Sequence, residues 1–287
     1  MREIRPDQEL HHSKKGAAVL TMQRVTRKGD HLDRYKTIGV YVLSIAIVVA
    51  AWEWSARQFG FLTLFPPPSA TFVRLAELLE DGSIGLAAWY SLGRILAGFV
   101  LGSVLGVFLG LLTGTSLTFR ALVDPYIHFF RFIPPLAWFA PMLLWFGTGE
   151  MTRILLIVYT TVFVVTLNTM AGVLSVPPNK ARMARSFGAT GPQVFFLITM
   201  PASMPYIFTG MRLAMGNSFA TVVAAEMLAA NNGLGYLIAS SQMWLEITTI
   251  FSAVIALGLL GFVADRLFQW LINRLGGQYA VQSTSSR

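Results

Sequence analysis

The sequence has no cysteine, little charge and no nucleotide-binding loop. The lack of cysteine among its 287 residues excludes disulfide scaffolds and Cys-ligated metal sites. Only 13% of the residues are charged and 54% are hydrophobic, with a mean hydropathy of +0.59, which excludes an ordinary soluble domain. No G-x-x-x-x-G-K-[ST] loop, HExxH motif or nucleophile elbow is present. The sequence therefore contains no motif that would indicate nucleotide hydrolysis, metalloprotease activity or hydrolysis by an activated serine. The composition predicts an all-α membrane protein.

Six predominantly apolar runs are candidates for transmembrane helices, each of which needs roughly 20 residues. They cover residues 37–55, 87–113, 133–148, 152–174, 203–227 and 247–270. Nine of the 22 Lys and Arg residues precede the first run, and positive residues stay on the cytoplasmic side during insertion. Six spans therefore predict that both termini are cytoplasmic. Because nine of the 22 basic residues lie in this tail, the net charge of +8 does not by itself indicate binding of nucleic acid.

The runs divide the chain into four parts. Residues 1–36 form the cytoplasmic basic tail, and residues 37–86 hold the first span and an outer segment. Residues 87–270 form a core of five spans with a cytoplasmic loop at 176–201, and residues 271–287 form a cytoplasmic tail. A short surface helix is expected after the prolines at 66–68, with Ser69 as its N-cap.

A glycine recurs at every fourth position of the second run. Residues at this spacing lie on one face of a helix, where the missing side chains allow another helix to approach closely. We interpret this face as a packing ridge rather than a substrate groove. We expect Gly106→Leu to be disruptive and Gly98→Ala to be much milder, because alanine still permits a close approach. The ridge consists of Gly98, Gly102, Gly106, Gly110 and Gly114.

Polar side chains inside spans are candidates for a solute path, because they are costly in lipid and usually face the interior of a bundle. Hydrogen bonds within or between helices are an equally good explanation of these residues. Glu53 and Glu226, near outer ends of spans, are expected to reach water rather than relay protons, and Arg94 either attracts anions or reaches the interface. The candidates for the path are Trp138, Thr166, Asn168, Asn217, Ser218 and Thr221.

The loop at 176–201 is too long and too structured for a simple connection. A first short helix is expected to end at Gly188, because glycine adopts the left-handed conformation that follows many helices. Thr190 with Gln193 fits a capping box that starts a second helix, which is expected to end before Pro201. The sequence therefore predicts a helix-turn-helix at the cytoplasmic surface.

This loop resembles the coupling loop of type I ABC importer permeases, whose pattern is Glu-Ala-Ala, three residues, Gly, nine residues, Ile-x-Leu-Pro. Arg182, Met183 and Met200 depart from that pattern, so no salt bridge through the acid of the motif is expected. The residues assigned to coupling are Arg182, Ala184, Gly188, Ala189, Ile198 and Pro201.

A wider resemblance, from about residue 91 to 268, is to the nitrate, sulfonate and taurine branch of these permeases. The segments that carry it are SLGRILAGFVLG, RFIPPLAWFAPMLLWFGTGE, LNTMAGV, PYIFTGMRLAMGNS and VVAAEMLAANNGLGYLI. The resemblance implies a type I permease fold and a homodimer in the bacterial inner membrane, surrounded by lipid. It also implies two cytoplasmic subunits that bind ATP and magnesium, a periplasmic solute-binding protein, and no cofactor on this chain.

The solute is left open by the sequence, with a sulfonate or taurine as the leading interpretation. Nitrate, bicarbonate, aromatic carboxylates and a thiamine-precursor pyrimidine are the alternatives. An ion-coupled secondary transporter is the competing class of function. It does not account for the coupling loop, and the internal repeats that are common in such transporters are not apparent here.

Overall fold

The computed structural model describes residues 39–58 and 64–275, and every regular element in these ranges is a helix. The chain divides into two compact units, residues 1–69 and 70–287. The first unit contains the helix Gly39–Gln58, which is long and apolar enough to cross a membrane. Near its end the Glu53 carboxylate accepts hydrogen bonds from the backbone N–H and hydroxyl of Ser69, at 3.1 and 3.0 Å. Both tails predicted to be cytoplasmic lie almost entirely outside the described residues.

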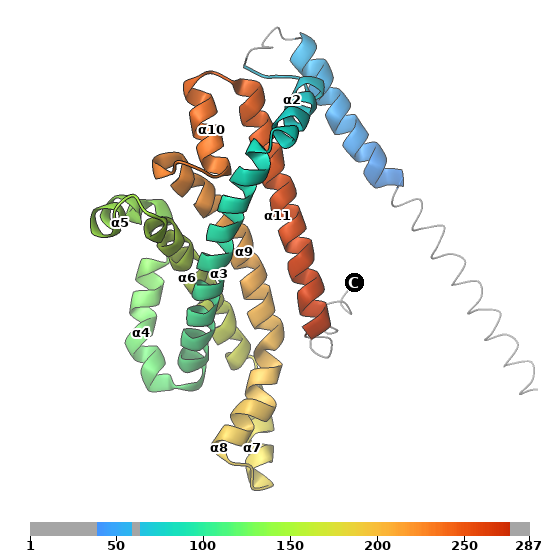
Figure 1. The fold of residues 1–287 in the computed structure, drawn as a ribbon. Coiled ribbons are helices and arrows are strands. Elements are labelled where there is room, and N and C mark those ends of the chain that lie inside the picture. Colours follow the sequence, from blue (N-terminus) through green and yellow to red (C-terminus); the bar gives the residue numbers. More distant parts are fainter. Residues whose placement is uncertain (1–38, 59–63, 276–287) are drawn as a thin grey trace, which may run out of the picture. The chain divides into compact units, whose positions relative to one another are not determined.

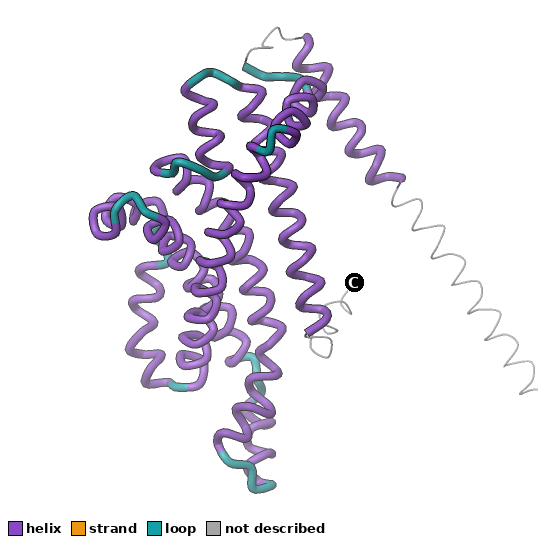
Figure 2. Tube along the Cα trace, viewed as in Figure 1, coloured by secondary structure: helices purple, strands orange, loops and turns teal. Residues whose placement is uncertain are grey.

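The second unit is a bundle of helices joined by short loops (Figures 1 and 2). In Figure 1, α7 and α8 lie at one end of this bundle and α10 at the other. The division between the units falls in the first turn of α2. The elements are α2 (Pro68–Glu80), α3 (Ser83–Thr115), α4 (Leu117–Phe130), η1 (Pro135–Trp138), α5 (Phe139–Phe146), α6 (Glu150–Leu174), α7 (Pro178–Ser186), α8 (Gly191–Val194), η2 (Phe195–Thr199), α9 (Met200–Ala229), α10 (Leu234–Met243) and α11 (Ile247–Leu275).

Five helical segments in the described chain have the length and hydropathy of membrane spans, and these agree with five of the six predicted runs. They are Gly39–Gln58, Ser83–Thr115, Glu150–Leu174, Gly191–Ala229 and Ile247–Arg274. The remaining predicted run, 133–148, does not form a helix of spanning length by itself. That region belongs to a pair of helical segments, Leu117–Phe130 and Pro135–Phe146, bent by 90°, which makes a sixth span only if the pair is counted as one.

The bend follows from Pro134 and Pro135, which interrupt the apolar run. Proline lacks an N–H donor and disfavours a helical conformation in the residue before it. Pro134 accordingly has extended backbone angles, φ −58° and ψ 140°, and a new helical segment begins at Pro135. The preceding segment, predicted to be a cytoplasmic loop, is the helix α4.

The core of the second unit is built on α3, α6 and α9. A Cβ added to any of the five ridge glycines would lie 2.5 to 2.8 Å from the Cβ of a residue of α6. The partners in α6 are also four residues apart, so the two helices run in register along this face. The partners, in the order of the glycines, are Ile157, Thr161, Val165, Thr169 and Val173.

The contact between α6 and α9 is also made at glycine residues. A Cβ added to Gly172 would lie 2.8 Å from the Cβ of Tyr206, and one added to Gly210 would lie 2.5 Å from the Cβ of Asn168. Helices without side chains at the contact approach closely, which increases van der Waals packing in a bilayer. Phe99 and Phe268, from α3 and α11, make an edge-to-face contact at 5.6 Å that adds α11 to the bundle.

The predicted surface helix is present as α2, but Ser69 is its second residue and not its N-cap. Pro68 begins the helix, as is common because a first-turn N–H has no partner within the helix. Leu75 and Leu78 are buried together with Ile84 at the start of α3. Further along the chain, the backbone turns at Gly233, which has φ +109°, and α10 begins directly after it.

Candidate functional site

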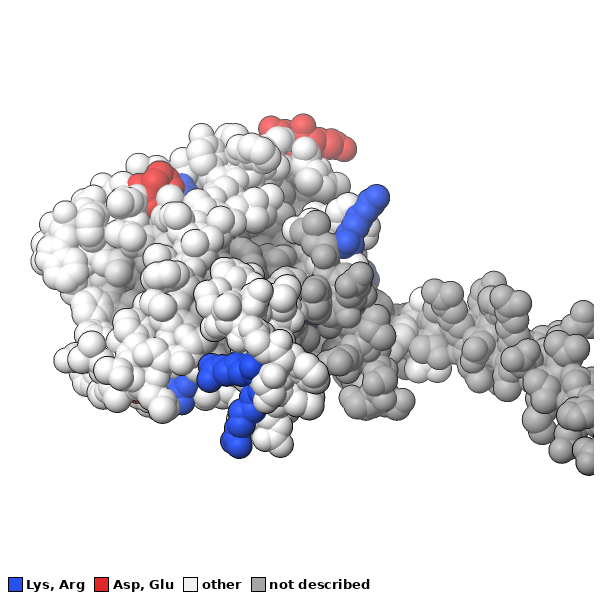
Figure 3. All heavy atoms as spheres, turned by 90° about the horizontal axis from the view of Figure 1, so that it is seen from below, with Lys and Arg blue, Asp and Glu red and all other residues white. Residues whose placement is uncertain are grey.

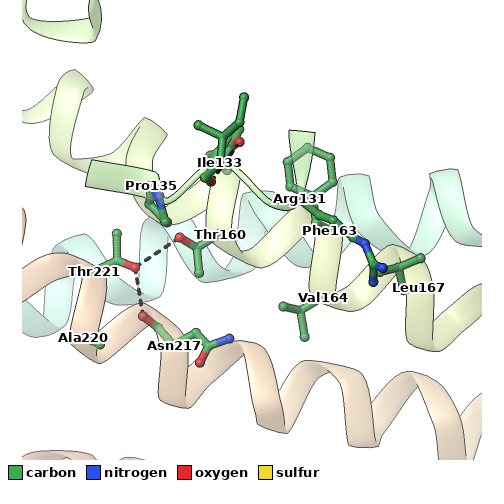
Figure 4. Close-up of a pocket in the computed structure, with 11 residues that line it drawn as sticks. Arg131, Ile133, Pro135, Thr160, Phe163, Val164, Leu167, Asn217, Ala220 and Thr221 are labelled. Carbon is green, nitrogen blue, oxygen red and sulfur yellow. Dashed lines mark hydrogen bonds between the residues drawn. The ribbon is translucent and has the colours of Figure 1, made fainter. Parts of the chain in front are cut away.

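A cavity of about 450 Å³ lies between the segment after α4 and the facing sides of α6 and α9 (Figure 4). This volume is typical of sites for small molecules. Its walls are mostly apolar, with a few hydroxyl and amide groups and one guanidinium. The lining residues are Arg131, Ile133, Pro135, Tyr159, Thr160, Phe163, Val164, Leu167, Asn217, Ala220 and Thr221.

The polar part of the cavity is formed where α6 and α9 face each other. The hydroxyls of Thr160 and Thr221 are 3.1 Å apart, and the Thr221 hydroxyl donates to the Asn217 carbonyl at 2.9 Å. Asn217, Ala220 and Thr221 are three and four residues apart, so α9 presents them on one face. Figure 4 shows these three residues and Thr160 grouped at one end of the cavity.

The structure places two of the six predicted path residues in this cavity, namely Asn217 and Thr221. Ser218 is fully buried and bonds to Thr161 and to the carbonyl of Ala214.

The other three make contacts outside the cavity. Asn168 donates to the carbonyl of Val164 and faces Gly210, whereas Thr166 is 1% exposed in the region of contact between α3 and α6. Trp138 packs against Phe130 and Tyr159.

Three polar lining residues are absent from the prediction made on the sequence: Arg131, Tyr159 and Thr160. The pair Thr160–Thr161 in an apolar run is a visible signal for Thr160. Arg131 lies between the predicted spans 87–113 and 133–148, so the sequence alone predicts that it is in a cytoplasmic loop. Tyr159 donates a hydrogen bond to the carbonyl of Phe130 at 2.5 Å, so it ties α6 to the end of α4.

The loop at 176–201, which resembles a coupling loop, begins with α7, and the end of α7 has the geometry of a Schellman motif. The N–H of Ala189 donates to the carbonyl of Ala184 at 3.0 Å, and that of Gly188 donates to Arg185 at 2.9 Å. Gly188 has a φ of +84°, which a residue with a side chain rarely adopts. Ala184, Gly188 and Ala189 therefore take part in the turn that ends α7.

The second half of the loop differs from the prediction. The N–H of Thr190 donates to the side chain of Gln193 at 2.8 Å, as the capping box requires. The helix does not end before Pro201, however, but continues through the π-turn η2 into α9. The N–H of Met200 bonds to the carbonyl of Phe195, five residues back. We infer that this wider turn accommodates Pro201, which lacks an N–H donor and would otherwise crowd the preceding turn.

The exposed surface of the loop is basic and aromatic. Lys180, Arg182 and Arg185 are exposed, and Phe187 is 89% exposed. No Asp or Glu stands between Glu150 and Glu226 in the sequence. Figure 3 views the end that carries α7 and α8 and shows Lys and Arg side chains among a mostly uncharged surface. A hollow of about 430 Å³ lies beside Gly188 and is lined in part by Ile198.

A buried ionic cluster corrects the predictions for Arg94 and Glu226. Neither side chain reaches water, since Arg94 is 3% exposed and Glu226 is fully buried. They form an ion pair at 2.5 Å, and Arg94 also contacts the half-exposed Glu150 at 2.6 Å. Glu226 accepts further bonds from Ser91 and from the N–H of Gly235. The cluster joins α3, α6 and α9 to the start of α10.

The comparisons with known proteins agree with this architecture. Residues 102–277 match the family described as "Binding-protein-dependent transport system inner membrane component". The taurine transport system permease protein TauC of Escherichia coli is 32% identical over 250 residues, which cover 85% of this chain and 90% of that protein. The nitrate import permease protein NrtB of Synechocystis is 35% identical over 257 residues, covering 86% and 94%.

The fold resembles that of a solved transporter. A chain from inward-facing conformations of the MetNI methionine ABC transporter aligns with a TM-score of 0.54 and 17% identity, over 64% of this chain and 93% of that one. At this identity the likeness concerns the fold alone. The matched family and the two relatives of nearly the same length agree with the shared fold. The chain is a multi-pass membrane protein that belongs to the family of binding-protein-dependent transport system inner membrane components, the permeases of type I ABC importers.

Proposed function

We propose that this permease works as a homodimer with two separate subunits that hydrolyse ATP and with a solute-binding protein on the outer side. The family and the functions for which its relatives are named support such an assembly in general. The chain has no P-loop of its own, so ATP and magnesium would be bound by the partner subunits. The setting is the cytoplasmic membrane of a bacterium, with both termini in the cytoplasm.

The observation that carries this proposal is the continuous helix from the coupling loop to the cavity. The segment Gly191–Ala229 includes the second half of the loop and also Asn217 and Thr221, which line the cavity. A displacement of the exposed loop is therefore a displacement of the cavity wall. Rigid-body motions of this kind open and close sites in many transporters and enzymes.

The proposed solute is a small anion, with a sulfonate or taurine preferred over nitrate or bicarbonate. Relatives named for transport of taurine and of nitrate support an anion. The cavity agrees with this class, because its lining contains no carboxylate and offers hydroxyl and amide groups. Apart from the guanidinium of Arg131 these groups are uncharged, and uncharged polar groups bind an anion weakly enough for it to leave again.

Reconstitution tests the coupling to ATP. The permease, purified with its ATPase and solute-binding subunits, is placed in liposomes, and uptake of labelled taurine is measured with and without ATP. Uptake should require ATP and should be lost in Gly188→Val, because a β-branched residue at φ +84° is strained by roughly 1 to 3 kcal/mol. Uptake that an ion gradient drives without ATP would support the secondary transporter instead.

Gly191→Val is the matched control for this experiment. An added Cβ meets no atom within 4 Å at either glycine, but Gly191 has no positive φ. The control should therefore transport normally. Normal complex formation and normal ATP-driven uptake in Gly188→Val would contradict the role of the loop in coupling.

Reporter fusions test the proposed orientation separately. The basic tail before the first span is expected to stay inside, and six crossings place the C-terminus on the same side. Alkaline phosphatase fused to the C-terminus should be inactive, since it requires the periplasm. An active fusion would refute the six-crossing topology and leave the assignment to the family unaffected.

A further inference from the structure

The cavity between α6 and α9 has a single charged residue in its lining, Arg131. In the described part of the chain, no carboxylate lies within 4.0 Å of this guanidinium. The guanidinium lies over the ring of Phe132, at 4.6 Å from the ring centroid. By contrast, Arg94, Arg153 and Arg212 all pair with carboxylates. Among the described residues, Arg131 is therefore a cation without a counter-ion at the edge of a cavity.

The two ends of the cavity differ in chemistry. Figure 4 shows the guanidinium of Arg131 beside Val164 and Leu167, away from the end where Thr160, Thr221 and Asn217 gather. Apolar side chains therefore lie between a cationic end and an uncharged polar end. A ligand that contacts both ends needs a charged group and a second polar group separated by an apolar spacer.

The hydrogen bonds at the polar end show which kind of second group fits. Either threonine hydroxyl can be the donor in the contact between them. In the arrangement where the Thr221 hydroxyl donates to the carbonyl of Asn217, the hydrogen between the two threonines comes from Thr160. Both hydroxyls have then used their hydrogens and present lone pairs to the cavity. This end therefore favours a ligand group that donates a hydrogen bond, such as an ammonium or a hydroxyl.

We propose that Arg131 is the residue with which the cavity recognises the negative charge of the solute, and that the Thr160–Thr221 pair accepts a hydrogen bond from a donor at the other end of the same molecule. The solute class is a short organic anion with a terminal donor, such as an amino- or hydroxyalkanesulfonate. This inference rests on the proposed function, because it takes the cavity as part of the solute path. It favours such a solute over nitrate, which has no donor.

The arrangement also suits release. Arg131 is exposed in the single chain, so its interaction with an anion is not made in a fully buried site and is moderate in strength. A hydrogen bond to a charged group changes a binding equilibrium about tenfold to a hundredfold, which is enough to select a ligand without trapping it. The guanidinium also matches the planar, two-pronged geometry of an oxyanion better than an ammonium does.

The test compares Arg131→Gln with Arg266→Gln in the reconstituted transporter. Arg266 is the matched control, since it is also an exposed arginine that lies over an aromatic ring, at 5.0 Å, and it is outside the cavity. Uptake of labelled taurine and ATP hydrolysis stimulated by the loaded binding protein are measured together. Arg131→Gln should reduce uptake on the order of tenfold to a hundredfold, whereas hydrolysis and the control should be unchanged. Arg131→Lys should retain part of the uptake.

Thr160→Val tests the other end of the cavity. This variant keeps the shape of the side chain and removes the hydroxyl, so uptake of taurine should fall more than uptake of propanesulfonate, which lacks the donor. Equal uptake by Arg131→Gln and Arg266→Gln would overturn the inference and leave the ATP-driven importer in place. Uptake by the unmodified complex that does not depend on ATP would refute the proposed function itself.

Discussion

Alanine substitution of Gly98 measures how closely α3 and α6 approach each other. The added Cβ would lie 2.5 Å from the Cβ of Ile157, 2.7 Å from its Cγ2 and 3.0 Å from the carbonyl oxygen of Ile154. Carbon atoms in contact are normally about 3.5 to 4.0 Å apart. A Cβ has no rotamer, and a β-branched isoleucine in a helix has little freedom at χ1, so the helices themselves have to separate.

Gly93→Ala in the same helix supplies the reference for this experiment. An added Cβ at Gly93 meets no atom within 4 Å, and the residue is exposed in the single chain. Both variants gain the same intrinsic helix propensity, about 1 kcal/mol, and lose the same backbone freedom in the unfolded chain. These terms cancel in the comparison, and the difference between the two variants is the cost of overpacking, about 1 to 3 kcal/mol.

Thermal unfolding of the purified protein in detergent is the assay. For a chain of this size a difference of 1 kcal/mol changes Tm by about 2 to 4 °C, so Gly98→Ala should unfold about 2 to 12 °C below Gly93→Ala. Equal midpoints would refute the close contact. The reason given from sequence alone, that alanine at Gly98 still permits a close approach, assumes more space than the structure provides.

Two further substitutions test the ionic cluster and the coupling loop. Glu226→Gln removes the fully buried carboxylate that pairs with Arg94 at 2.5 Å, while Glu150 still contacts Arg94. It should destabilise the protein by up to about 3 to 5 kcal/mol and more than Glu150→Gln, whose side chain is 53% exposed; equal changes in Tm would contradict this. Arg182→Glu reverses one of three exposed charges on the loop. If the ATPase subunit presents acidic groups to this loop, the change should weaken copurification of that subunit in low salt and have less effect in high salt. Copurification of the ATPase subunit that does not change with salt would exclude such a contact.

Features that depend on neighbouring residues could be predicted from the sequence. The turn at Gly188 and the capping box of Thr190 with Gln193 follow from local chemistry, and the structure contains both. The repeat of glycines at every fourth position likewise shows which face of α3 they share. It does not show which helix packs there, because the partner residues in α6 lie about 59 positions further along the chain.

Features that depend on distant residues or on a change of direction could not be predicted in this way. Arg94 and Glu226 are 132 residues apart, and no local pattern indicates that they pair. The sequence alone therefore does not predict that they are buried together. Hydropathy averaged over the run 133–148 conceals the effect of Pro134 and Pro135. Without that bend, Arg131 belongs to a loop surface, and half of the chemistry of the cavity is lost from the prediction.

The π-turn Phe195–Thr199 sets the phase of α9. An α-helix advances about 1.5 Å and 100° per residue, so Asn217, eighteen residues after Thr199, lies about 27 Å further on and after five complete turns. The wide turn contains one residue more than an α-helical turn and so fixes the rotational setting of everything that follows. If this turn tightened to α-helical geometry with all its residues retained, the cavity face of α9 would rotate by about 100° relative to α8, with every lining side chain unchanged. The rotation of the cavity face of α9 relative to α8 thus depends on five residues that are part of neither helix.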